Sequence, residues 1–149
     1  MNAEKMTQKA MEALEAAHAD AVRKGHPELT TLHLLQALLD QEHGLTGNLF
    51  GKMGKDPGIL QQAVSEKLGK LPTFNGASGR VAASGGMNQV LVRSDDEAKQ
   101  LGDEYVSVEH LLLAILEEGK SGPAGRLLQE HSIRRKELLK TLEDVRGGQ

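Results

Sequence analysis

The sequence has no cysteine and no tryptophan, and its aromatic residues are two phenylalanines and one tyrosine. Without cysteine, the chain cannot form disulfides, thiolate nucleophiles, or zinc and iron–sulfur sites with cysteine ligands. Its core must therefore consist of Leu, Ala, Val and Met rather than aromatic rings. A chain of 149 residues can bury roughly 70% of its unfolded surface, so it needs no cross-link or metal to fold.

The sequence also lacks an excess of charge of one sign and any long apolar run. Its 18 Lys and Arg oppose 21 Asp and Glu, which gives a formal net charge of −3. This balance argues against nucleic acid as a partner, because phosphate binding needs clustered basic residues. No stretch has the roughly 18 apolar residues of a membrane span, and the first residues (MNAEK) include no apolar signal region. We therefore expect a cytoplasmic protein without a membrane partner.

An internal repeat is the main feature of the sequence. A shift of 77 positions superimposes residues 30–40 (TTLHLLQALLD) on residues 107–117 (SVEHLLLAILE). The same shift matches Thr7 with Ser84, Leu14 with Leu91, Ala21 with Ala98 and Gly25 with Gly102. Because these residue types begin, pack and end helices, the pattern indicates a duplicated helical unit.

The first copy predicts four helices. Residues 8–24 carry small and apolar side chains at three- and four-residue spacing, after a suitable N-cap at Thr7. Thr30 caps a second helix that ends by Gly44, and residues 45–53 give a short third helix. Asp56, followed by proline, begins the fourth helix.

The second copy repeats this plan. Its predicted helices carry Met87 to Leu101, follow a cap at Ser107, include Leu127 and Leu128, and begin at Ser132. The four prolines lie at or outside helix ends, and no stretch shows a sustained two-residue alternation. The sequence thus predicts an all-α fold of eight helices, arranged as two pseudo-twofold-related four-helix repeats.

The predicted organisation is one domain over residues 1–149. Repeat one covers about 6–69, a glycine-rich connector covers 70–86, and repeat two covers about 87–146. The last residues, 147–149, read as the start of a linker. Each repeat alone has a small core, so we expect the two repeats to pack against each other.

The motifs that suggest catalysis are weak. Residues 114–121 (AILEEGKS) match a loose phosphate-loop pattern, but they continue a leucine-rich helix and include two carboxylates. The six histidines lack the spacing of helical zinc ligands, and the equivalent positions of His33 and His110 favour a packing or hydrogen-bonding role. The acidic pairs at 95–96, 103–104 and 117–118 are typical of a solvated face. We predict no cofactor, no metal site and no enzymatic activity in this chain.

The apolar helix faces are mostly core. A two-repeat bundle nevertheless leaves a seam between its halves, where some apolar side chains stay half exposed. Such a seam is suited to holding an extended or unfolded polypeptide.

The order of these features resembles the N-terminal domain of the Clp/Hsp100 chaperones. The resemblance rests on the duplicated unit, residues 32–39 (LHLLQALL), the connector with Leu71-Pro72, residues 102–109 (GDEYVSVE) and the closing Arg-Gly-Gly. It covers essentially the whole chain, and the long connector looks most like that of the ClpB-type disaggregases. The resemblance implies an eight-helix domain that precedes two AAA+ ATPase modules in a hexameric parent.

By the same resemblance, the domain binds unfolded or aggregated protein in an apolar groove between its repeats, for transfer to the ATPase pore. The implied substrate-binding residues are Thr7, Leu91, Asp103 and Glu109, and an Hsp70-class system is the implied co-chaperone. Arg93 and His110 stand where the family has apolar residues near the groove. The alternatives are an adaptor-docking domain of a Clp protease unfoldase, a small phosphate-loop enzyme using Lys120, and a purely structural spacer.

Overall fold

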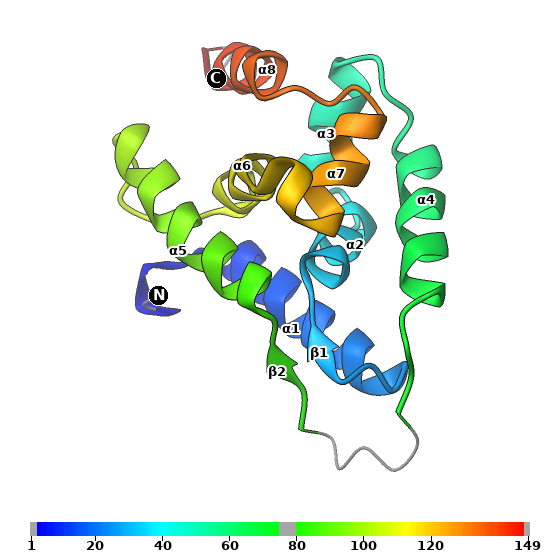
Figure 1. Cartoon of the computed structure of the whole chain (residues 1–149). Coiled ribbons are helices and arrows are strands. Elements are labelled where there is room, and N and C mark those ends of the chain that lie inside the picture. Colours follow the sequence, from blue (N-terminus) through cyan, green and yellow to red (C-terminus); the bar gives the residue numbers. More distant parts are fainter. Residues whose placement is uncertain (1–2, 75–79, 148–149) are drawn as a thin grey trace.

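The computed structural model describes residues 3–74 and 80–147. These residues form eight α-helices, with two short 3-10 helices (Ala3–Lys5 and Gly119–Ser121) and two strands of two residues each (Figure 1). The helices are α1 (Gln8–Arg23), α2 (Thr31–Asp40), α3 (Leu45–Lys52), α4 (Pro57–Gly69), α5 (Gly85–Gln100), α6 (Val108–Glu118), α7 (Pro123–Glu130) and α8 (Arg135–Gly147). The prediction of an all-α fold with eight helices is confirmed.

The first helix of each repeat begins in the same way. The Thr7 hydroxyl accepts a hydrogen bond from the Ala10 N–H at 3.2 Å, and the Ser84 hydroxyl accepts one from the Met87 N–H at 3.0 Å. Each cap thereby satisfies one of the backbone donors that the first turn of a helix leaves free. The matched start of α1 and α5 follows from the matched residues at 7 and 84.

The same two helices also end alike. Gly25 and Gly102 adopt φ angles of +69° and +72°, a conformation that glycine reaches without strain. The residues after them, His26 and Asp103, donate their backbone N–H to the carbonyls of Ala21 at 3.0 Å and Ala98 at 2.9 Å. This is the Schellman arrangement, and it fixes the direction in which the chain leaves each helix.

The second helices, α2 and α6, begin with a capping box that uses histidine. His33 Nδ1 accepts the Thr30 backbone N–H at 2.9 Å, and His110 Nδ1 accepts the Ser107 backbone N–H at 2.8 Å. Both histidines are buried. The predicted hydrogen-bonding role of this matched pair is therefore confirmed.

Two short backbone joints link the repeats. Strand β1 (Glu28–Leu29) pairs in parallel with β2 (Ala82–Ala83), and Leu29 lies opposite Ala83. The equivalent residues in the other repeat are Val106 for Leu29 and Met6 for Ala83. These two form an isolated parallel bridge.

The hydrogen bonds next to the joints repeat as well. The Ser84 N–H donates to the Leu29 carbonyl, and the Thr7 N–H donates to the Val106 carbonyl, both at 2.9 Å. Each joint connects the segment before the second helix of one repeat to the segment before the first helix of the other. The repeats are thus interlocked about a pseudo-twofold axis.

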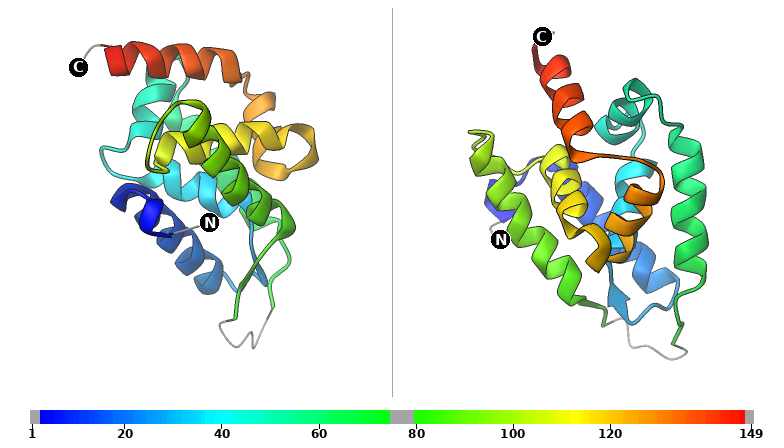
Figure 2. Two further views of the ribbon diagram at one scale, coloured as in Figure 1. Left: turned by 90° about the vertical axis from the view of Figure 1, so that its left-hand side faces the viewer. Right: turned by 45° about the horizontal axis from the view of Figure 1, so that its top comes forward.

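The core is continuous through both repeats and centres on α2 and α6 (Figures 1 and 2). Nearly every residue from 31 to 39 and from 108 to 116 is buried, because these helices are covered on all sides. Helix α1 packs mainly on α2, and α5 packs mainly on α6. The alanines at 10, 13, 17 and 21 are fully buried and allow α1 to approach closely.

The fourth helices reach across to the opposite repeat. Helix α4 lies against α7 as well as α2 and α3, and α8 lies against α3 as well as α6. Figure 2 shows α8 crossing one end of the bundle. Helix α4 packs more closely on its own repeat than α8 does, and this difference leaves a pocket beside α8.

A carboxylate provides a further link between the repeats. Glu118, at the end of α6, accepts hydrogen bonds from the Thr31 hydroxyl at 3.0 and 3.1 Å and from the Gly125 N–H of α7 at 3.0 Å. Burial raises its pKa. The pair at 117–118 is therefore not simply a solvated face, since Glu118 is half-buried and caps α7.

Three predicted helix boundaries differ from the observed ones. Helix α5 already begins at Gly85, because Ser84 supplies its cap, so its first two residues lie inside the predicted connector. Helix α8 begins at Arg135 rather than after Ser132, whose φ of +59° is incompatible with a helix N-cap. Helix α2 ends at Asp40, and Gly44 instead caps α3.

Candidate functional site

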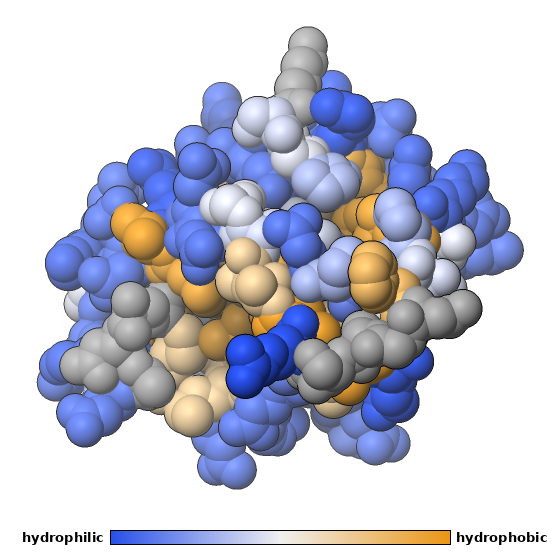
Figure 3. Space-filling model, turned by 60° about the horizontal axis from the view of Figure 1, so that its bottom comes forward, coloured by the Kyte–Doolittle hydropathy of each residue, from blue (hydrophilic) through white to orange (hydrophobic). Residues whose placement is uncertain are grey.

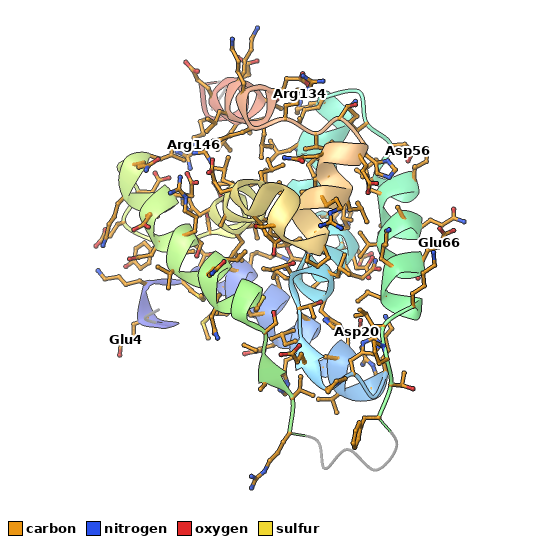
Figure 4. The ribbon with its side chains drawn as sticks, in the orientation of Figure 1. Glu4, Asp20, Asp56, Glu66, Arg134 and Arg146 are labelled. Atoms are coloured by element: carbon orange, nitrogen blue, oxygen red, sulfur yellow. The ribbon has the colours of Figure 1, made fainter. Side chains whose placement is uncertain are left out.

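The turn between α5 and α6 brings together two of the residues singled out in the sequence. Asp103 directly follows the glycine that ends α5, and Glu109 lies in the first turn of α6. Their carboxylates are joined by Arg146, from the last turn of α8, whose Nη2 lies 2.8 Å from Asp103 Oδ2 and 3.0 Å from Glu109 Oε2. Figure 4 places Arg146 between α8 and the end of α5.

Each carboxylate also has a partner on its own side of the site. Because His110 Nδ1 accepts a backbone N–H, its Nε2 carries the proton and donates to Asp103 Oδ2 at 2.7 Å. The Ser107 hydroxyl donates to Glu109 Oε1. Both carboxylates are therefore oriented by the capping box of α6.

The surroundings keep both groups ionised. Burial by itself raises the pKa of Asp103, but hydrogen bonds from Arg146 and His110 outweigh it, and the pKa lies below its ordinary value. Burial also raises the pKa of Glu109, but hydrogen bonds from the Ser107 hydroxyl and Arg146 outweigh it, so this pKa too lies below its ordinary value. At neutral pH the site thus holds two carboxylates and one guanidinium.

Thr7 lies next to this turn. Its backbone N–H is bonded to Val106, which directly precedes the cap of α6, and its hydroxyl caps α1. The structure therefore gathers Thr7, Asp103 and Glu109 around the segment 103–109. The positive end of the α1 dipole also points toward this region.

Leu91 lies elsewhere, on α5, ten residues before its C-cap Leu101. Ten helical residues span roughly 15 Å. Leu91 and its counterpart Leu14 on α1 are both half-buried and pack against the core. Under the shift of 77 positions the two leucines are equivalent, so Leu91 occupies in repeat two the place of Leu14 in repeat one, about 15 Å along α5 from the turn that carries Asp103.

Other partly exposed apolar residues accompany them. Met6, Leu29 and Ala83 pack partly against the core, and Tyr105 is 48% exposed. Figure 3 views the face that carries β1 and β2, where apolar side chains gather in the middle and polar ones surround them. This face therefore offers apolar surface with a polar surround.

The two polar residues near the expected groove both have partners. His110 is buried in the hydrogen bonds described above. Arg93 Nε donates to the fully buried Glu97 at 3.0 Å, and its Nη2 lies 3.8 Å from Glu117. Neither residue is a free polar group in an apolar groove.

The residues that suggested catalysis lie in ordinary helical structure. Residues 114–118 continue α6 and residues 119–121 form a 3-10 turn, so the strand required before a phosphate loop is missing there. In the two described ranges, no three His, Asp or Glu side chains are arranged to hold a metal ion. None of the helices in that part of the chain has the length and apolarity to cross a membrane.

Arg146 is the site residue that the sequence did not predict. In the sequence, Arg146 stands out only as the residue before two glycines. Its contacts depend on the path of α8 across the bundle, which the sequence did not indicate. The internal repeat gave no signal for it, because the equivalent residue at the end of α4 is Gly69, which has no side chain.

Comparison with known proteins places this geometry in a family. The family model of the Clp repeat (R) N-terminal domain matches residues 5–131. The chaperone protein ClpB of Nitratidesulfovibrio vulgaris is 44% identical over 100% of this chain, which covers 18% of that protein. ClpB of Clostridium perfringens is 35% identical over the same share of the chain and 18% of its own length.

Solved structures agree on the fold. The Hsp104 N-terminal domain from Candida albicans superimposes with a TM-score of 0.84 at 24% identity, covering 97% of this chain and 93% of that one. A ClpV N-domain in complex with a VipB peptide gives a TM-score of 0.76 at 20% identity, covering 91% and 82%. The chain spans about a fifth of the ClpB relatives that it matches. With its duplicated helical repeat and a match over most of its length, this chain belongs to the family of Clp repeat N-terminal domains, and is an N-terminal domain of the ClpB/Hsp104 type.

Proposed function

We propose that this domain binds exposed apolar segments of unfolded or aggregated polypeptides for the AAA+ ATPase modules of a longer, ClpB-type disaggregase. The observation that carries the proposal is the 44% identity to a ClpB chaperone over the whole chain. The chain's own part is capture, and the parent's ATPase modules, acting as a hexamer, pull the captured segment into their pore. An Hsp70-class partner belongs to the same proposal, as does a cytoplasmic location.

The geometry supports a division of labour within the site. Half-buried Leu91 and Leu14 supply apolar contact along the seam. Thr7, Asp103 and Glu109 supply polar contact at one end of it, where the two carboxylates attract basic groups and accept backbone N–H groups. Binding is weak because a tightly held segment could not be passed on.

An NMR titration tests this function. The ¹⁵N-labelled domain is titrated with reduced, carboxymethylated lactalbumin, which cannot refold, and with the native form as a control. We expect saturable shifts at Thr7, Leu91, Asp103 and Glu109 with the unfolded form only. Unchanged amides at these four positions overturn the site.

Two substitutions on one helix sharpen this test. Leu91→Gln removes a half-buried seam residue, whereas Val92→Gln makes the same chemical change at a side chain that is 62% exposed on α5. The first weakens binding of the unfolded substrate, and the second leaves it within about twofold. Equal effects of the two substitutions contradict a binding site at the seam.

The second candidate function is docking of an adaptor, as in a Clp protease unfoldase. A specific observation favours considering it, since a ClpV N-domain of this fold is known in complex with a VipB peptide. Binding of unfolded lactalbumin in the absence of any adaptor supports capture of substrates. Binding restricted to one defined peptide supports docking instead.

A further inference from the structure

We infer that Arg146 is an exchangeable internal ligand of the Asp103–Glu109 site, and that a basic side chain of a bound polypeptide takes its place. The inference rests on the proposed function, because it assumes that the domain binds polypeptide segments. It assigns a substrate chemistry to the site: a basic residue with an apolar neighbour.

The carboxylates stay in place without Arg146. His110 holds Asp103 through a 2.7 Å hydrogen bond, and Ser107 holds Glu109. Both supports belong to the capping box of α6, whereas Arg146 lies 43 residues after Asp103 and 37 after Glu109, on α8. The site is therefore preorganised for a cation independently of the one that now fills it.

Arg146 itself is accessible enough to leave. Its side chain is 38% exposed, against 27% for Asp103 and 12% for Glu109. A second arginine on the same helix shows the contrast. Arg135 binds the fully buried Glu97 through both of its terminal nitrogens, at 2.5 and 2.7 Å, and no incoming side chain can reach that carboxylate.

The charge around Arg146 favours a replacement cation. When the guanidinium leaves, Asp103 and Glu109 lose their shared cation, and Glu143 lines the adjoining pocket. Their attraction for a basic group is appreciable because Asp103 and Glu109 are partly shielded from water.

An apolar pocket begins beside the same guanidinium. Its volume is about 500 Å³, and it lies between the end of α5 and α8, lined by Leu101, Leu139, Leu142, Glu143, Arg146 and Gly147. We call it the α5–α8 pocket. It is large enough for a leucine or phenylalanine side chain. Because Arg146 lines the pocket, a side chain bound there lies next to the site formed by Asp103 and Glu109.

A matched pair of labelled peptides tests the inference. One carries Leu-Arg-Leu at its centre and the other carries Leu-Gln-Leu, and the dissociation constant of each is measured by fluorescence anisotropy. Arg146→Gln removes the internal competitor, so the arginine peptide binds about fivefold more tightly than to the natural sequence, while the glutamine peptide is unchanged. Arg146→Lys gives an intermediate result, because lysine cannot reproduce the two-nitrogen contact of Arg146 with Asp103.

Arg135→Gln is the control on the same helix. It lowers the thermal midpoint because the buried Glu97 loses one of its cationic partners. It does not change the ratio of the two peptide affinities. If Arg146→Gln binds the arginine peptide with an affinity equal to or lower than that of the natural sequence, the inference of exchange is wrong.

NMR of the Arg146 side-chain Nε–H adds an independent readout. Exchange requires this signal to shift with the same saturation curve as the Asp103 amide signal. A stationary Arg146 signal during saturation at Asp103 also overturns the inference.

The test separates this inference from the proposed function. If both peptides bind the natural sequence and Arg146→Gln alike, the domain captures polypeptides but Arg146 is only structural. If neither peptide nor unfolded lactalbumin binds any form, the proposed function fails and the inference falls with it.

Discussion

His33 and His110 occupy the same position in the two repeats but have different partners. In repeat two, His110 Nε2–H donates to the carboxylate of Asp103. In repeat one, His33 Nε2 lies 2.8 Å from Nδ1 of His26, at the position equivalent to Asp103. Because His33 Nδ1 accepts the Thr30 N–H, Nε2 carries the proton and donates to His26 Nδ1, and a second proton on His33 breaks the capping bond.

This pair predicts a dependence of stability on pH. Burial lowers the pKa of His33 to about 4, with a smaller contribution from His26, while the unfolded value is about 6.5. Below pH 6.5 the unfolded chain therefore binds protons that the native state does not. The free energy of unfolding falls as the pH drops from 6.5 toward 4, by at most about 3 kcal/mol for this residue.

Urea unfolding at a series of pH values measures this loss. His33→Gln flattens the dependence between pH 6.5 and 4.5, because glutamine at this helix position still accepts the Thr30 N–H but does not titrate. His18→Gln is the control, since His18 is exposed on α1. Identical pH profiles for His33→Gln and the natural sequence would rule out this explanation.

Glu97 is a residue at which a conservative change is costly. Its side chain is fully buried on α5 and binds Arg135 of α8 and Arg93. Burial by itself raises its pKa, but hydrogen bonds from Arg135 and Arg93 reverse the shift, and the pKa lies below its ordinary value. Glu97→Gln lowers the free energy of unfolding by about 3 kcal/mol, because two guanidinium groups lose their buried counter-charge.

Asp95→Asn provides the comparison for this prediction. Asp95 pairs with Lys99 on the exposed side of α5, at 3.2 Å. Denaturant unfolding should show a change within about 0.5 kcal/mol, since exposed pairs contribute little. A similar cost for Asp95→Asn and Glu97→Gln would show that burial of the ion pair is not the cause.

At the scale of helices, matched caps and stops identified the first helix of each repeat, although Thr30 and Gly44 together misplaced the end of α2. Thr7 with Gly25, and Ser84 with Gly102, define α1 and α5 because the backbone groups at helix ends need these residue types. The start of α8 could not be predicted in this way. Serine is a residue type that often caps helices, so Ser132 suggested a helix start. Its backbone instead adopts a positive φ, in the turn that leads the chain into α8.

The joints and the site needed three-dimensional information. Strands of two residues have no periodicity, so nothing in residues 28–29 or 82–83 indicated that they pair. Asp103 and Glu109 came from a family resemblance, and Arg146 did not appear because its partners are 37 and 43 residues away. Local patterns indicated the helices, while contacts between distant helices decided the site.

The two caps make a prediction that separates stability from binding. Thr7→Ala and Ser84→Ala each remove one side-chain acceptor at a helix start, so each lowers the free energy of unfolding by about 1 kcal/mol. Urea denaturation measures both. If Thr7 also contacts substrate, Thr7→Ala weakens the binding of unfolded lactalbumin and Ser84→Ala does not.

Thr7→Ser completes this comparison, because serine keeps the hydroxyl and the cap. It should retain both stability and binding. Equal losses of affinity for Thr7→Ala and Ser84→Ala would assign Thr7 to capping alone.

At the scale of the whole molecule, the two repeats should unfold together. They share one continuous core, are linked by two backbone joints, and each contacts the fourth helix of the other. Differential scanning calorimetry should show a single transition whose calorimetric and van't Hoff enthalpies agree. Two resolved transitions would mean that the repeats are energetically independent.

The reciprocal backbone joints also bear on how such a chain arises. A polypeptide containing one repeat would expose a strand edge and one face of its fourth helix, and a second copy placed across the same axis would cover both. Two separate subunits would thus form a symmetric homodimer, and gene duplication with fusion would convert that dimer into one monomer. Fusion also frees each half to diverge, and the two halves now carry different partners for the matched histidines, His26 in one and Asp103 in the other.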